Sequence, residues 1–135
     1  MQGGTPGEQN SVFANKPDLT CPRLLSAITM DLTHLKLIFN EKLSASLPAP
    51  DDFQITPATE IESIAFGDYN LTSLLIESKT PFEKNVLYTI EMQNIYDCTG
   101  NLISEAFSTG EFALTESATS LDVVVNEILF NPRPT

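Results

Sequence analysis

The residues that most often perform chemistry in proteins are sparse in this chain. His34 is its only histidine and lies close to Thr33 and Lys36. A catalytic triad or a histidine metal site needs an imidazole that is paired with a carboxylate, a thiol or a second imidazole. The sequence pattern instead places His34 on the solvent side of a strand, and we expect a surface residue there in preference to a functional one.

The chain has two cysteines, Cys21 and Cys98. They form no CxxC motif and pair with no histidine, which leaves two unrelated free thiols or a disulfide as the alternatives. We expect the disulfide, because both cysteines lie at predicted strand ends where chain segments can meet. Closing so long a loop would stabilise the fold by about 4 kcal/mol. A disulfide would also indicate an oxidising compartment, and hence a periplasmic, cell-surface or secreted protein.

Acidic and amide side chains gather at two predicted turns, Asp51 with Asp52 and Asp97 with Asn101. Their oxygen atoms are weak candidates for a Ca²⁺ contact, although such residues in turns more often bond their own backbone. A glycosidase would need two carboxylates across a cleft, and the chain has no glycine-rich phosphate loop. We therefore predict no metal site, no cofactor and no enzymatic activity.

Three aromatic side chains, Tyr69, Phe82 and Tyr96, fall in predicted loops or at strand ends. Exposed aromatic rings can stack on sugar rings, so a carbohydrate-binding module is the alternative function that we keep open. The chain has no tryptophan, which weakens this alternative. Phe82 and Tyr96 could equally close the ends of the hydrophobic core.

Charge excludes several classes of partner. The chain has 135 residues and a formal net charge of −11. A surface of this sign repels nucleic acid and anionic lipid headgroups. No run of 18 apolar residues occurs, so we expect no insertion into a membrane. The first residues lack a secretion signal, and we expect the leader of an exported protein to lie outside this chain.

The element around which the chain is organised is a strand at 86–93 that runs into a turn at 97–101. One face of this strand has Val86, Tyr88, Ile90 and Met92, and the other has Leu87, Thr89, Glu91 and Gln93. This period of two predicts a central strand with one buried and one wet face. A second clear alternation at 33–40 places Leu35, Leu37 and Phe39 on one face, which predicts another half-buried strand.

Five more strands complete the prediction. They lie at 24–30, 53–55, 60–66, 72–78 and 106–114, with expected bulges between residues 61 and 64 and at 109–110. The loop at 42–52 is expected to hold at most one helical turn. Seven short strands separated by turn residues predict an all-β protein, a sandwich of about seven antiparallel strands.

Composition divides the chain into four segments. Residues 1–20 are expected to be a flexible linker or tail, 21–114 the sandwich and 115–121 a second linker. Residues 122–135 begin with a strongly apolar strand, which we interpret as the first strand of a following domain that the chain does not contain. An unpaired apolar strand tends to add to the open edge of another sheet, so we also expect self-association through residues 122–130.

Residues 21–114 resemble the bacterial Ig-like domains of surface-layer and other exported multidomain proteins. The likeness rests on the runs at 35–43 (LKLIFNEKL), 52–55 (DFQI) and 88–90 (YTI), and on the turn at 94–101 (NIYDCTGN). Cys98 in that turn departs from the common form of the family. The run at 122–132 resembles the opening strand of a bacterial lamin-tail-type domain. These resemblances imply a non-catalytic spacer or interaction module, whose partners are neighbouring domains of the same polypeptide and possible glycan or protein ligands.

Overall fold

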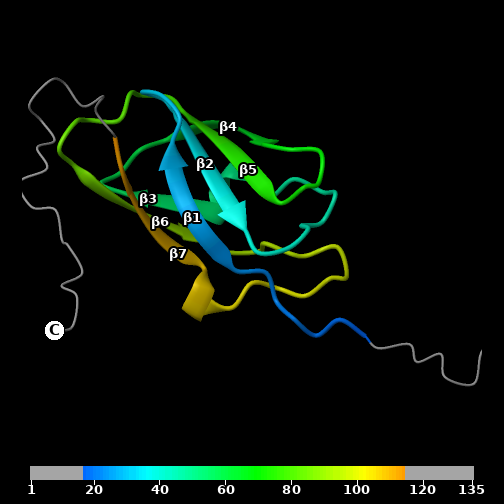
Figure 1. The fold of residues 1–135 in the computed structure, drawn as a ribbon. Helices are drawn as coiled ribbons and strands as arrows, with labels where there is room; N and C mark the ends of the chain where they lie inside the picture. The colour runs from blue at the N-terminus through cyan, green and yellow to red at the C-terminus, as the bar shows by residue number, and fades with distance from the viewer. Residues whose placement is uncertain (1–16, 115–135) are drawn as a thin grey trace, which may run out of the picture.

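The computed structural model describes residues 17–114, which form two antiparallel β-sheets packed face to face (Figure 1). This confirms the predicted all-β sandwich of seven antiparallel strands. The strands are β1 Leu24–Thr29, β2 His34–Phe39, β3 Phe53–Thr56, β4 Ile61–Phe66, β5 Ser73–Ser78, β6 Leu87–Met92 and β7 Thr109–Ala113. Two short 3₁₀ turns, η1 Pro50–Asp52 and η2 Glu105–Phe107, are the helical elements of the described part.

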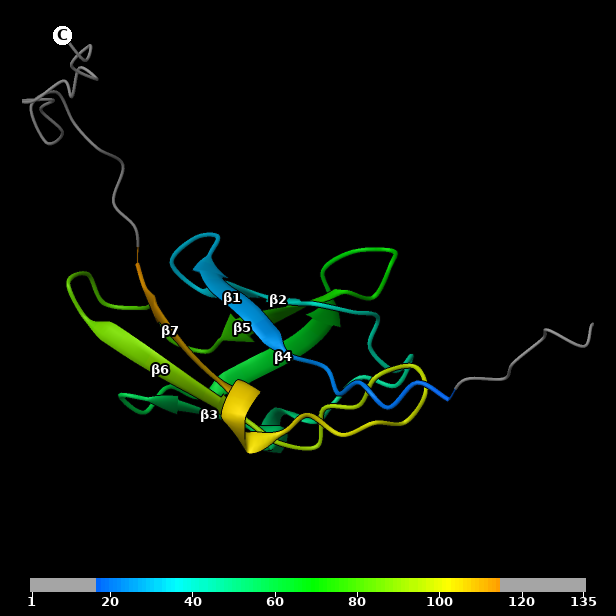
Figure 2. The ribbon, with the colours of Figure 1, turned by 60° about the horizontal axis from the view of Figure 1, so that its bottom comes forward.

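One sheet has four strands in the order β1-β2-β5-β4, and the other has three in the order β3-β6-β7. The predicted central strand therefore lies at the centre of the three-stranded sheet. β1, at one edge of the four-stranded sheet, lies beside β7, at one edge of the three-stranded sheet (Figure 2). Sheets of this size become stable by burying one face of each against the other.

The core is built by the two alternations that the sequence shows most clearly. Leu35 and Leu37 of β2 are fully buried, and so is Ile90 of β6. Burying side chains of this size stabilises a fold by about 2 kcal/mol each. An aromatic cluster closes the core: the Tyr88 ring stacks on Phe112 at 5.2 Å between centroids and meets Phe82 edge-on at 5.3 Å.

Two predictions about β7 were wrong. The strand begins at Thr109 because Glu105–Phe107 forms the turn η2. No bulge occurs at 109–110, where Glu91 pairs with Thr109 and Ile90 with Gly110 in regular register. Gly110 has a packing reason instead, since a Cβ atom there would lie 2.5 Å from Leu24 Cδ2 of β1.

The bulge expected in the fourth strand is confirmed, because the pairing of β4 with β5 shifts between Ile61 and Ser63. A second irregularity, between Leu24 and Ser26 of β1, was not predicted. It lies on an edge strand, where bulges are common. No helix among residues 17–114 is long and apolar enough to cross a membrane. The expectations for residues 1–16 and 115–135 fall outside the described part of the chain.

Candidate functional site

The turn after β6 is held by Asp97, one of the predicted site residues. Its Oδ1 accepts hydrogen bonds from the backbone N–H groups of Thr99 and Asn101, both at 2.8 Å, and its Oδ2 accepts the Asn101 side-chain amide at 2.7 Å. The Asp97 side chain is fully buried. Burial raises the pKa of Asp97, but the hydrogen bonds from Asn101 and Thr99 outweigh it and bring the pKa to about 2. Asp97 is thus an ionised, internally bonded turn residue.

Two carboxylates that the sequence did not single out join Asp97. Asp18 of the lead-in and Glu41 after β2 bring oxygen atoms that lie with those of Asp97 within 4.8 Å of one another. Partial burial of Glu41 and repulsion from Asp18 and Asp97 raise the pKa of Glu41. Hard oxygen donors of this kind suit Ca²⁺, but the oxygens of Asp97 already accept several hydrogen bonds. Sequence reasoning could not predict this cluster, because positions 18 and 41 lie far from the turn in sequence and meet it only in the folded chain.

The side chains of the other acidic pair, Asp51 and Asp52, do not form a common site. Asp51 is exposed, whereas Asp52 ends the turn η1 and accepts two hydrogen bonds: Oδ2 from the Ala49 N–H at 2.9 Å and Oδ1 from Asn94 Nδ2 at 2.6 Å. Asp52 therefore fixes the loop before β3 to the residues that follow β6. Asp52 thus bonds the backbone of its own turn, as acidic residues in turns often do, and it does not form a pair of metal ligands with Asp51.

Both cysteines are free thiols in the structure, which gives the expected Cys21–Cys98 bridge no support. Cys98 is exposed on its turn, while Cys21 is half-buried beside the buried ring of Pro22. The two segments do lie against each other. They are joined by a hydrogen bond from Asn101 Nδ2 to the Asp18 carbonyl oxygen at 2.9 Å. This polar contact links the two segments that the disulfide was expected to link.

The three predicted aromatic residues separate into two groups. Phe82 is only 3% exposed and belongs to the core cluster, so it offers no surface to a ligand. This corrects its place among the ligand contacts, because its edge-on packing with Tyr88 and Phe112 needs the ring inside. Tyr69 is fully exposed, and Tyr96 is 43% exposed.

Tyr96 borders a hollow of about 270 Å³ that sequence reasoning missed. The loop between β2 and β3 forms one wall and residues 94–96 form the other, with Phe66 at the end of β4. Phe66 also lines a second, shallower hollow with Tyr69 and Leu71. Two loops distant in sequence create this concave surface, which explains why no local pattern could have indicated it.

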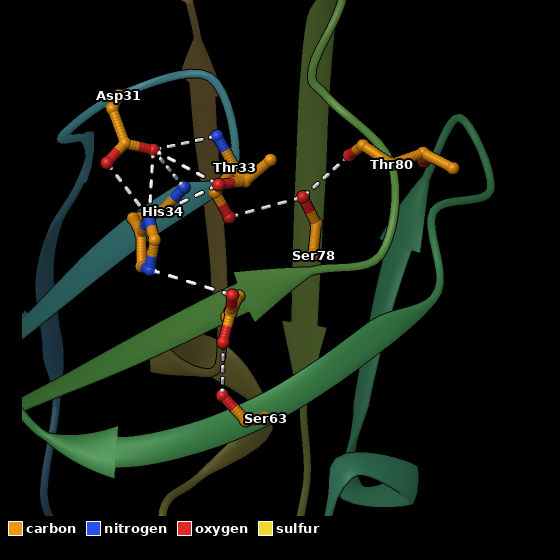
Figure 3. Close-up of polar contacts among 7 residues, drawn as sticks. Asp31, Thr33, His34, Ser63, Ser78 and Thr80 are labelled. Atoms are coloured by element: carbon orange, nitrogen blue, oxygen red, sulfur yellow. Dashed lines mark hydrogen bonds and ion pairs between the residues drawn. The ribbon is translucent and has the colours of Figure 1, made fainter.

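His34 lies in a polar network at the other end of the sandwich (Figure 3). Its Nδ1 bonds both carboxylate oxygens of Asp31 at 2.9 Å, and its Nε2 lies 4.0 Å from Glu77 Oε1. The Thr33 N–H and the His34 ring lower the pKa of Asp31 to about 2. A triad would need a hydroxyl nucleophile at Nε2, where Glu77 lies instead. The network therefore stabilises the turn between β1 and β2.

Comparisons with known proteins support the fold. No family model and no curated protein matches the chain. Among solved structures, a crystal structure of the S-layer protein rSbsC(31-844) matches with a TM-score of 0.66, 18% identity and 73% of this chain covered. The N-terminal part of the bacterial S-layer protein SbsC matches with a TM-score of 0.63 at 19% identity over 70% of the chain.

A third structure, domains 1-6 of surface layer protein SbsC, matches with a TM-score of 0.63 at 14% identity over 75% of this chain. The chain corresponds to 14%, 23% and 15% of the three solved chains. It therefore shares the fold of a single part of those multidomain proteins.

Proposed function

We propose that residues 17–114 form a non-catalytic Ig-like spacer domain of a larger exported surface protein. The observation that carries the proposal is where the two ends of the described chain leave the sandwich. The lead-in contacts the turn that follows β6, through Asp18 and Asn101. Ala113, at the end of β7, pairs with Leu87, the first residue of β6. The two ends are thus at opposite ends of β6 (Figure 2).

This placement suits a module in a linear array. A preceding and a following domain would attach at opposite poles, and the rigid sandwich would keep them apart. A six-residue strand spans about 20 Å, which sets a lower bound on the spacing. The similarity to parts of S-layer proteins supports both the modular role and an extracellular location. The sandwich could also contact its neighbours through its end loops.

The Ig-like character is supported by strand order. Constant-type Ig domains pair strands A, B, E and D in one sheet and C, F and G in the other. Assigning β1 to β7 to the letters A to G gives the same arrangement, β1-β2-β5-β4 and β3-β6-β7.

A second support is a tyrosine corner. In Ig sandwiches a tyrosine near the start of strand F bonds the backbone a few residues upstream. The Tyr88 hydroxyl near the start of β6 accepts the Glu83 N–H at 2.8 Å. Antibody domains place a disulfide cysteine two residues later, and this chain has the fully buried Ile90 in that position.

The tail fits the same proposal. We interpret residues 122–135 as the opening strand of the next domain, of lamin-tail type, because residues 122–130 are strongly apolar and follow the polar linker at 115–121. Without that domain the same strand would seek another sheet edge, so the chain should self-associate through residues 122–130. Sedimentation velocity of the chain with and without residues 115–135 tests this: the longer form alone should dimerise. A monomer in both forms would contradict it.

Pulling the chain by its two termini in single-molecule force spectroscopy tests the spacer role. A sandwich anchored at opposite poles should unfold in one step that releases residues 17–114. At about 3.5 Å per residue, the contour length should increase by roughly 300 Å. A gradual extension with no discrete step would contradict a load-bearing spacer. Turnover of a substrate by the purified chain would contradict the non-catalytic part of the proposal.

A further inference from the structure

The hollow beside Tyr96 has the features of a small ligand site. Its walls are mainly apolar, and its polar groups come from few positions. Ligand sites generally combine a concave apolar surface with a small number of polar groups that fix orientation. A volume of about 270 Å³ suits one ring-sized unit of a longer ligand.

The aromatic residues extend this surface beyond one unit. Tyr96 lines the first hollow, Phe66 lines both hollows, and Tyr69 lines the second. Tyrosine rings combine an apolar face with a polar tip, which suits contacts with molecules that have both C–H and O–H groups. Tyr69 is fully exposed, so both faces of its ring are free to contact a ligand.

The polar groups are held in place before any ligand arrives. Asn94 has a positive φ of 55°, a conformation that asparagine tolerates, and its Nδ2 donates to Asp52 at 2.6 Å. The Gln93 N–H donates to the Asp52 carbonyl oxygen at 2.9 Å, which ties the same two segments by their backbones. Asn94 Oδ1 accepts no hydrogen bond from the described residues, so it can accept one from a ligand hydroxyl. Preorganised groups of this kind lose little entropy on binding.

Charge selects the class of ligand. The residues that line the two hollows include no lysine, arginine or histidine, and each hollow has one carboxylate, Asp52 or Asp68. With a net charge of −11, the chain repels anions. Both oxygens of Asp52 are already bonded, so the remaining capacity suits a neutral hydroxyl donor better than an ion pair.

We propose that the surface formed by Tyr96, Phe66, Tyr69 and Asn94 binds an uncharged oligosaccharide. A pyranose ring would stack on Tyr96 in the hollow, donate a hydroxyl to Asn94 Oδ1, and continue over Phe66 toward Tyr69. This function goes beyond the spacer role and is independent of it, because a spacer can work without binding a glycan.

Titration of the ¹⁵N-labelled chain with chitohexaose, cellohexaose and maltohexaose, followed by NMR, tests the proposal. At least one of them should shift the amide signals of residues 44–47 and 94–96 at millimolar concentration. Tyr96→Ala should weaken that binding about tenfold, the value of one aromatic stacking contact. Asn94→Gly keeps the positive φ but removes the amide, and it should also weaken binding. Tyr69→Ala should have a smaller effect.

Leu87→Ala is the matched control, since Leu87 is 61% exposed at the opposite end of β6 and should leave binding unchanged. Urea unfolding of each variant separates lost binding from lost folding. The proposal is overturned if none of the three hexasaccharides binds, or if binding survives both Tyr96→Ala and Asn94→Gly. Stronger binding of hexagalacturonate or hexalysine would also overturn it, because the ligand would then be charged. None of these results would affect the force measurement that tests the spacer role.

Discussion

Replacing Tyr88 by phenylalanine isolates one hydrogen bond of the fold. The hydroxyl accepts the Glu83 N–H at 2.8 Å, while the ring remains buried between Phe82 and Phe112. A phenylalanine keeps the ring packing and removes only the acceptor. A typical net value for such a bond is about 1 kcal/mol. Because Glu83 is exposed, its amide can bond water instead, so we expect a loss of about 0.5–1 kcal/mol.

Urea unfolding followed by circular dichroism measures this loss. The midpoint should fall with an unchanged m-value, and the melting temperature should fall by about 3–6 °C. Tyr69→Phe is the control: Tyr69 is fully exposed and accepts no bond from the described residues, so its loss should be negligible. Tyr88→Ala, which removes the ring, should cost about 3–5 kcal/mol. A Tyr88→Phe variant as stable as the parent would refute the tyrosine corner as a stabilising contact.

Three further predictions concern single side chains. Glu41→Gln should raise the melting temperature at pH 7 by roughly 2–4 °C. The reason is that the raised pKa of Glu41 reflects an unfavourable negative charge in the folded state. Calorimetry should show that this gain disappears near pH 4, where Glu41 is protonated. Asp97→Asn should lower the free energy of unfolding by about 2 kcal/mol, as measured by urea unfolding at pH 7. Since the pKa of Asp97 is lowered from 3.8 to about 2, its contribution is lost as pH falls through this interval, and the variant should have a flatter acid limb. Asn85→Ala should cost roughly 0.5–1 kcal/mol because of its φ of 62°, whereas Asn85→Gly should be neutral; equal urea midpoints would contradict this.

Local periodicity was sufficient to predict the strands because it reports which face is buried. The alternations around Leu37 and Ile90 identified two core strands correctly, and both residues are fully buried. The turn residues at 97–101 were also recognised, since an aspartate that bonds the backbone two residues on leaves a local signature. These features depend on neighbours in sequence.

What the sequence could not predict depends on contacts between distant segments. Gly110 was assigned to a bulge, but its role follows from the close approach of Leu24, which local patterns do not reveal. Phe82 follows a proline in a loop, and only the rings of Tyr88 and Phe112 explain its burial. The hollow beside Tyr96 likewise needs two loops that meet only in the folded chain.

A spacer in a linear array requires that the chain enters the sandwich at one pole and leaves at the other. Pulsed electron resonance between spin labels at Leu19→Cys and Leu114→Cys tests it most directly, in a background with Cys21 and Cys98 replaced by serine. We predict one narrow distance distribution centred well above 20 Å, the approximate span of a six-residue strand. A distribution centred below about 20 Å, less than the span of one six-residue strand, would place both ends at one pole and contradict the spacer account.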